Sequence, residues 1–193
     1  FNAGQKGLKG GVDEGGVRVP FFVRWKNKIN SGKDVEKLAA HIDIFPTFAD
    51  LAGLKLNEKL SNQIEGRSLL KLIENPDATW QDRFLFTQRA RWKTGAEPND
   101  HMWQNFAVRN QRYRLVGERL FDMIKDPAQK NDISKENAGV VESMRKAYDD
   151  FWKSSRPLMV NETVPMSKVR PYHVWFKEQS MNKGIPTWDD PKL

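Results

Sequence analysis

The stretch NFAVRNQRYRLVGERLFDMI, residues 105–124, decides the fold of this 193-residue chain. It contains three short segments rich in aromatic and branched apolar residues, with a brief polar turn between one segment and the next. Phe106 and Val108, and then Tyr113 and Leu115, alternate with smaller or polar neighbours. Alternation with a period of two is typical of strands that bury one face. The stretch therefore predicts an antiparallel meander.

The segments on either side of the meander extend the prediction to a small α+β domain. RFLFTQ, residues 83–88, has the composition of a further strand. Residues 137–154 carry apolar side chains at helical spacing, which predicts a helix packed on the meander. That stripe consists of Val140, Met144, Ala147, Tyr148 and Phe151. We place this domain at residues 81–155 and expect residues 156–193 to form an irregular tail over the surface.

Residues 1–80 predict the end of an α/β domain. The apolar run VPFFVRW, residues 19–25, follows a turn-rich stretch, as a buried strand would. HIDIFPTFADLAG, residues 41–53, predicts a helix in which Asp43 caps the amino end. EGRSLLKLIENP, residues 65–76, predicts a turn or a short helix that ends at its proline.

Composition and charge limit the classes of protein to which this chain can belong. Seven Trp and eleven Phe exclude a disordered chain, and no apolar run approaches the roughly 18 residues of a membrane span. The chain has no cysteine, so it makes no disulfide and offers no thiol. The net charge of +7 and the pI of about 9.6 suit nucleic acid, acidic polysaccharide or anionic lipid, or simply a solvated surface with a surplus of lysine.

The glycine-rich stretch KGLKGGVDEGGVRVP, residues 6–20, is the first candidate for a site. Six of the thirteen glycines of the chain lie between Gly4 and Gly16, yet no nucleotide-binding motif is present. Backbone N–H groups at glycines, together with a lysine, suit a tetrahedral oxyanion. The alternative is a tight connection with its charges in water. Glu14 and Arg18, four residues apart, are expected to brace the loop.

Five segments resemble type I sulfatases, and they occur in the order found in that family. LKGGVDEGGVRVPFFVRW, residues 8–25, is similar to the lysine-glycine pair and the E-G-G-x-R-x-P motif that precede a strand of the catalytic domain. The other four are HIDIFPTFADLAG, GRSLL, FAVRNQRYRLV and RLFDMIKDPAQKNDIS. The resemblance covers about residues 3–153.

This resemblance implies an alkaline-phosphatase-like α/β fold. A large mixed sheet, whose last part is residues 1–80, would be followed by a small four-stranded antiparallel sheet with a carboxyl-terminal helix. It also implies hydrolysis of sulfate esters by a formylglycine nucleophile and a calcium ion. Lys9 occupies the position of the family lysine that contacts the sulfate, so it is the candidate catalytic and substrate-binding residue. Lys6 lies outside the motif and is expected to be solvated.

The chain lacks the other catalytic motifs of that family. C-x-P-x-R, S-x-P-x-R and an early Asp-Asp pair are all absent. We therefore expect the formylglycine and the calcium ligands upstream, in the amino-terminal remainder of a sulfatase, and expect this chain to be inactive alone. The expected location is periplasmic or secreted. The alternatives are a non-catalytic module that binds anionic polysaccharide and a related enzyme that acts on phosphate esters.

A second candidate site is RARWKTGAEPNDHMWQN, residues 89–105. Its Arg91, Lys93 and His101 accompany two tryptophans, a combination that suits a sulfated small molecule or polysaccharide. An ordered surface loop packed by its tryptophans is the equal alternative. Single-stranded nucleic acid is a weaker possibility, and we expect neither a nucleic-acid nor a membrane partner. His41 is expected to be structural, because it has no evident partner for proton transfer.

Overall fold

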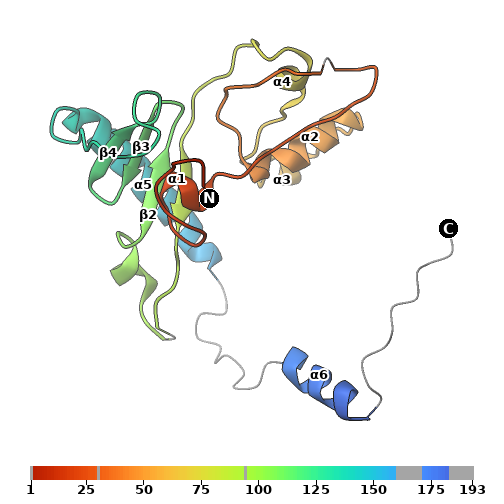
Figure 1. The fold of residues 1–193 in the computed structure, drawn as a ribbon, viewed down its shortest axis with the longest axis vertical. Helices are drawn as coiled ribbons and strands as arrows, with labels where there is room; N and C mark the ends of the chain where they lie inside the picture. Colours follow the sequence, from red (N-terminus) through yellow and green to blue (C-terminus); the bar gives the residue numbers. More distant parts are fainter. Residues whose placement is uncertain (1, 30, 94, 160–170, 183–193) are drawn as a thin grey trace.

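A four-stranded antiparallel sheet forms the centre of the molecule (Figure 1). The computed structural model describes residues 2–29, 31–93, 95–159 and 171–182. The strands follow one another in chain order: β1 (Leu85–Gln88), β2 (Phe106–Arg109), β3 (Tyr113–Val116) and β4 (Arg119–Asp122). The predicted meander and its additional strand are confirmed.

One face of the sheet packs on helix α5 (Ala138–Ser155). The register pairs Leu115 with Val108 on one side and with Leu120 on the other, so a row of apolar side chains crosses the sheet. The buried core consists of Met102, Phe106, Val108, Leu115, Leu120, Met144, Tyr148 and Trp152. The predicted helix is confirmed, although its buried stripe also includes a tryptophan that the prediction left out.

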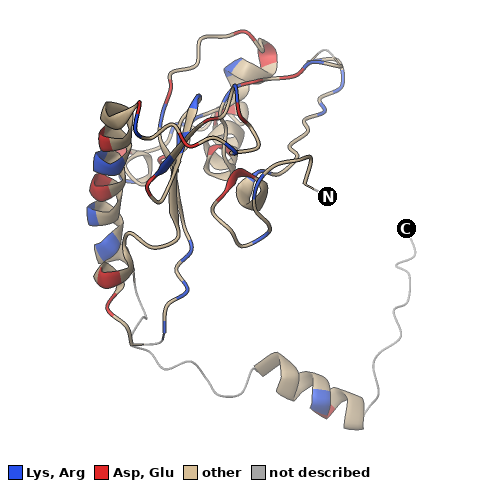
Figure 2. Ribbon diagram, turned by 60° about the vertical axis from the view of Figure 1, so that its left-hand side comes forward, with Lys and Arg blue, Asp and Glu red and all other residues tan. Residues whose placement is uncertain are grey.

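The opposite side of α5 faces solvent and carries its charged residues (Figure 2). Lys146 pairs with Asp150 at 2.7 Å and Lys153 with Asp149 at 2.5 Å, each one helical turn apart. One apolar stripe and one charged face are what a helix covering a single sheet requires.

The second face of the sheet is also covered, which the alternating pattern did not predict. Arg114 lies between Tyr113 and Leu115, where the alternation predicts an outward-facing side chain, yet it is 4% exposed. The glycine-rich loop and the short helix α1 (Glu14–Val17) lie against this face (Figure 1). A polar residue in an alternating strand is therefore buried here because another segment supplies its partners.

Short helices account for the regular structure of the described residues before β1. Besides α1, they are η1 (His41–Asp43), α2 (Ile44–Leu51), α3 (Glu58–Ser61) and α4 (Leu70–Glu74). Gly53, two residues after the last residue of α2, has φ +65°, so it ends the helix where the pattern placed it. The predicted short helix in residues 65–76 is confirmed by α4.

The prediction of a buried strand at residues 19–25 is wrong for this chain. The segment is not paired with any described strand, and Phe22 is 91% exposed. A strand is buried only when neighbouring strands complete its ladder and other elements cover it. No part of the chain that the structure describes does either, so the apolar run stays in solvent.

The prediction that the side chain of Asp43 caps the helix of residues 41–53 is wrong for α2. Asp43 directly precedes α2 but makes no side-chain cap to that helix. Its buried carboxylate instead accepts hydrogen bonds from the N–H groups of Ala40 and Arg67 and pairs with the guanidinium of Arg83. Burial alone would raise the pKa of Asp43, but these donors outweigh it and hold that pKa below its ordinary value.

The carboxyl-terminal region contains regular structure where a tail was predicted. Helix α6 (Pro171–Asn182) shows that the irregular reading of residues 156–193 is wrong for these twelve residues. The rest of that prediction falls partly on residues 160–170 and 183–193, which lie outside the described residues. Among the described helices, none is long and apolar enough to cross a membrane.

Candidate functional site

Lys9 projects from a tight turn of the glycine-rich loop. The N–H group of Gly11 donates to the carbonyl of Leu8 at 2.8 Å and closes the turn. Gly10 has φ +84°, a conformation that side-chain-bearing residues rarely adopt. The side chain of Lys9 is exposed, and no carboxylate of the described residues forms an ion pair with it. The turn therefore presents an uncompensated cation.

The glycines hold the loop together rather than cradle an anion. Gly15 donates its N–H to the carbonyl of Lys6 at 2.7 Å, and Gly16 donates to that of Asp13 at 2.9 Å. A Cβ on Gly16 would lie 2.5 Å from the carbonyl oxygen of Gly11. These N–H groups are already satisfied within the loop, so the predicted backbone oxyanion site is wrong for them.

Lys6 is not the solvated residue that the motif position predicted. Its ammonium lies 3.8 Å from Asp13 Oδ1 and 5.1 Å from the centre of the Phe121 ring, and its side chain is only 32% exposed. The ion pair with Asp13 lies within the loop, and the cation–π contact with Phe121 attaches the loop to β4. The two lysines of the stretch differ, since only Lys9 is free to meet a ligand.

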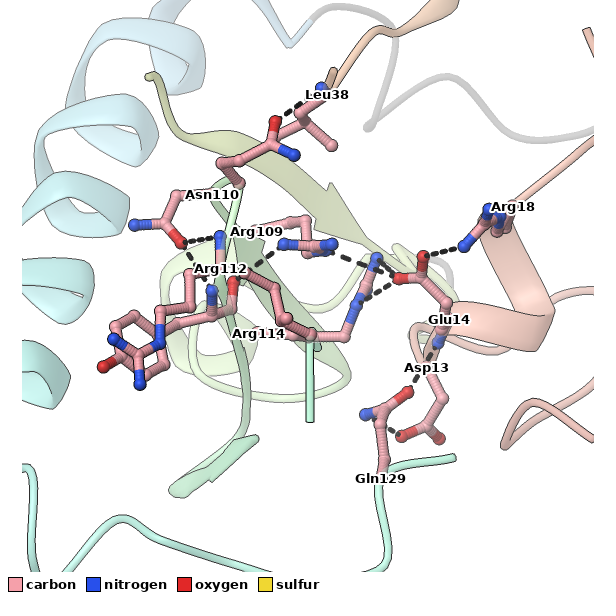
Figure 3. A network of polar contacts seen from close by, with 12 residues as sticks. Asp13, Glu14, Arg18, Leu38, Arg109, Asn110, Arg112, Arg114 and Gln129 are labelled. Carbon is pink, nitrogen blue, oxygen red and sulfur yellow. Dashed lines mark hydrogen bonds and ion pairs between the residues drawn. The ribbon is translucent and has the colours of Figure 1, made fainter. Parts of the chain in front are cut away.

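Glu14 joins the loop to the sheet (Figure 3). Arg109 and Arg114 are directly opposed on β2 and β3, where two like charges repel. The carboxylate of Glu14 lies 2.8 Å from Arg114 Nη2 and 3.6 Å from Arg109 Nε, so it compensates both. Arg18 adds a weaker contact at 3.7 Å. The predicted bracing role is confirmed, with partners about a hundred residues away in addition to Arg18.

Burial and the shared carboxylate act in opposite directions on these two arginines. Burial lowers the pKa of Arg114 and of Arg109, and the charge of Glu14 raises each in part. A guanidinium still remains charged at any ordinary pH. The site is therefore held by two buried cations that depend on one carboxylate.

Gln129 makes a further contact with the loop, from the turn after β4. Its Oε1 accepts from the N–H of Glu14 at 2.8 Å, and its Nε2 donates to Asp13 Oδ1 at 3.2 Å (Figure 3). The residue is 3% exposed and has φ +53°. Sequence reasoning assigned it no role, although the segment that contains it was among those that resemble sulfatases.

The residues predicted to read the substrate are not gathered around Lys9. Arg91 and Lys93 are exposed near the tip of the segment between β1 and β2, which Figure 1 shows apart from the glycine-rich loop. His101 stacks on Trp92 with ring centres 5.5 Å apart, and its Nδ1 lies 3.0 Å from Gln104 Oε1. Trp92 packs against the core, so its ring helps to order this segment.

Comparisons with known proteins identify the family. The sequence profile of the family described as N-sulphoglucosamine sulphohydrolase, C-terminal, matches residues 9–154. The chain belongs to this family. The profile begins at Lys9 and ends within α5, so it includes the glycine-rich loop, the sheet and the helix that covers the sheet. The resemblance to the carboxyl-terminal part of sulfatases is confirmed.

Several proteins that are named as sulfatases are similar to the chain. Steryl-sulfatase of Homo sapiens is 29% identical over 157 residues, which are 67% of this chain and 26% of that protein. N-acetylglucosamine-6-O-sulfatase of Bacteroides thetaiotaomicron is 25% identical over 170 residues, 75% of this chain and 29% of that protein. The uncharacterized sulfatase YdeN of Escherichia coli K12 is 26% identical over 187 residues, which are 81% of this chain and 33% of that protein. The chain thus spans a third or less of these relatives.

Solved structures confirm the fold. The crystal structure of Ps i-CgsB superimposes with a TM-score of 0.65 at 22% identity, covering 93% of this chain and 37% of that one. Its complex with k-i-k-neocarrahexaose gives a TM-score of 0.64. At this level of identity the match shows the shared fold alone.

The described residues provide no ligand set for calcium. They contain no group of three or more His, Asp or Glu side chains that could hold a metal ion, and the chain has no cysteine. The carboxylates that are buried here, such as Asp43 and Glu14, are committed to arginines. No catalytic step is therefore assigned to a metal held by this part of the chain.

Proposed function

We propose that the chain is the carboxyl-terminal part of a sulfatase that hydrolyses sulfate esters, and that Lys9 binds the sulfate group. The observation that carries the proposal is the state of Lys9: it is exposed, without an ion pair to the described residues, on a loop that Glu14 braces against the sheet. Membership of the family supports the reaction class.

Lys9 would act by electrostatic stabilisation. A sulfate ester carries one negative charge, and more charge develops on the leaving oxygen as the S–O bond lengthens. An ammonium held beside that group stabilises the transition state more than the ground state. A fixed loop matters because the benefit depends on the cation being in place before the reaction.

The proposed substrate is a sulfated carbohydrate. Relatives named N-acetylglucosamine-6-O-sulfatase and N-acetylgalactosamine-6-O-sulfatase support this class. Arg91, Lys93 and His101 would contact charged groups of a longer substrate away from Lys9. The formylglycine and the calcium ligands would come from an amino-terminal remainder of the enzyme, which we place in the periplasm or outside the cell.

Replacement of Lys9 tests the assignment. In the full-length sulfatase that contains this chain, Lys9→Ala should lower kcat/KM for a sulfate ester by about 100-fold or more, because one positioned charge is removed from the transition state. Lys33→Ala, at another exposed lysine, should leave turnover unchanged. Turnover of Lys9→Ala near that of the wild type would refute the role of Lys9.

The upstream coding sequence provides the complementary test. C-x-P-x-R or S-x-P-x-R preceded by paired aspartates would supply the nucleophile and metal ligands that the proposal requires. A reading frame without them would favour the second candidate, a non-catalytic module that binds anionic polysaccharide. The net charge of +7 and the exposed cations Arg91 and Lys93 are the observations behind that candidate. The binding-module candidate predicts that the chain is retained on a sulfated-polysaccharide column and is released by moderate salt.

A further inference from the structure

The amino end of α1 is capped from a distant part of the chain. Asp13 stands at the N-cap position but makes no side-chain cap. The first N–H of the helix, on Glu14, donates instead to Gln129 Oε1 at 2.8 Å. The Nε2 of Gln129 donates one hydrogen bond to Asp13 Oδ1 at 3.2 Å. One carboxamide therefore satisfies both a donor and an acceptor at the start of α1.

The backbone of Gln129 is unusual in a way that serves this contact. Its φ of +53° lies in the left-handed region, which a residue with a long side chain rarely occupies. The side chain is 3% exposed, although glutamine is usually found at the surface. A glycine would satisfy the turn at no steric cost. A glutamine here is explained by its side chain, because the turn conformation alone would favour glycine.

The helix α1, whose start is held by Gln129, packs closely on the backbone of the turn that carries Lys9. Gly16 of α1 abuts the turn that carries Lys9, since a Cβ on Gly16 would lie 2.8 Å from the carbonyl oxygen of Leu8. Gly15 is hydrogen-bonded to the backbone of Lys6 on the other arm of the loop. The helix and the Lys9 turn therefore meet through backbone atoms, without a flexible side chain between them.

We propose that Gln129 is a positioning residue for the reaction: its carboxamide fixes the start of α1 against the small sheet and thereby sets the place of the Lys9 ammonium. This inference rests on the proposed function, in which Lys9 binds the sulfate group. It makes the small domain part of the catalytic apparatus, although Gln129 itself touches no substrate.

A double-mutant cycle in the full-length sulfatase tests the proposal. Gln129→Gly removes the carboxamide and relieves the left-handed backbone, so it changes the contact without adding strain. We expect kcat to fall about 10- to 100-fold, as misplacement of a catalytic group does. In a Lys9→Ala background the same substitution should cause at most about a twofold further loss. Asn27→Gly, at an exposed residue with φ +63°, is the matched control and should leave kcat unchanged.

Gln129→Glu separates the two hydrogen bonds. The carboxylate can still accept from the N–H of Glu14, but it cannot donate to Asp13 and meets it as a like charge. We expect an intermediate loss of kcat. A value equal to that of the wild type would show that the bond to Asp13 does not contribute to the position of Lys9.

Hydrogen exchange gives a readout that does not depend on Lys9. In Gln129→Gly the amides of residues 9–17 should exchange about tenfold faster than in the wild type, while those of β2 and β3 keep their rates. Unchanged exchange in residues 9–17 would overturn the proposal. So would an equal loss of kcat with and without Lys9, because that result indicates a general loss of folded enzyme. If Lys9→Ala alone retains turnover, the proposed function fails, and the exchange rates still decide whether Gln129 orders the loop.

Discussion

Buried carboxylates in this protein pair with arginines that lie far away in the sequence. Asp43 pairs with Arg83, and Glu14 pairs with Arg114 and Arg109. The transfer of a charge out of water is unfavourable unless a partner is present, so loss of one member of a buried pair costs more than the pair contributes. Single substitutions at such residues should therefore be severe.

Asp43→Asn should lower the free energy of unfolding by about 3–5 kcal/mol at pH 7, because it leaves the guanidinium of Arg83 buried without a counter-charge. The pKa of Asp43 is lowered in the folded state from its ordinary value of 3.8. Its contribution is therefore complete at neutral pH and is lost as the pH falls below about 4. Urea unfolding of both proteins at pH 7 and pH 3 measures the difference.

The pH dependence distinguishes this pair from simple loss of packing. The wild type should lose more stability than Asp43→Asn between pH 7 and pH 3, since the asparagine does not titrate. Equal losses in the two proteins would contradict the role given to Asp43. Asp150→Asn, at an exposed pair on α5, should change the urea midpoint little.

Gly66→Ala should prevent normal packing of the segment before α4. A Cβ at Gly66 would overlap the carbonyl group of Ile42, and the obstacle is backbone rather than a flexible side chain. We expect a loss of several kcal/mol or failure to fold, measured by circular dichroism and thermal unfolding. Gly139→Ala is the control, because a Cβ there meets nothing within 4 Å and alanine favours α5. A harmless Gly66→Ala would show that these two segments are not in contact.

At the scale of elements, the sheet and α5 are the part of the fold best predicted from sequence. Strand alternation in residues 105–124 and the helical stripe in residues 137–154 are local patterns, and local patterns predict which face is apolar. The same rule failed at residues 19–25, where the apolar run meets no partner among the described residues. It also failed at Arg114, since the loop that covers that strand face lies about 100 residues earlier.

The attachment of α5 to the sheet depends on one phenol as well as on apolar contacts. Tyr148 is fully buried, and its hydroxyl oxygen lies 2.5 Å from Gln88 Oε1 and 2.9 Å from the carbonyl oxygen of Met102, two acceptors that share its one proton. Tyr148→Phe should lower the free energy of unfolding by about 1–3 kcal/mol, because it leaves buried acceptors without a donor. Thermal unfolding measures this, and Tyr172→Phe, at an exposed tyrosine, should be neutral. If Tyr148→Phe is as stable as the wild type, the hydroxyl is not needed at these acceptors and water satisfies them instead.

Two segments of the described chain expose large apolar side chains. Phe22 in residues 19–25 and Phe48 on α2 are 91% and 65% exposed, and several neighbours of each are also exposed. Clusters of exposed large apolar side chains mark an interface. The amino-terminal remainder proposed above is the occupant that would cover it.

The 193-residue chain by itself should consequently bind the dye 1-anilinonaphthalene-8-sulfonate and self-associate at micromolar concentration. Phe22→Ser combined with Phe48→Ser should reduce both effects several-fold without changing the far-ultraviolet circular dichroism. Leu158→Ser, which alters a single exposed leucine on η3 (Arg156–Leu158), should have no effect. A chain that stays monomeric and binds no dye would contradict an open interface.

The four strands of the sheet, helix α5 and the family could be predicted from the sequence, because alternation, helical spacing and the E-G-G-x-R-x-P motif are properties of contiguous residues. The sequence also pointed to Lys9 through that motif. Only the tertiary structure decided what holds the Lys9 loop. Glu14, Arg114 and Gln129 lie on segments up to 115 residues apart, and no local pattern specifies which distant groups meet. Buried polar groups must find partners, but chain folding selects those partners.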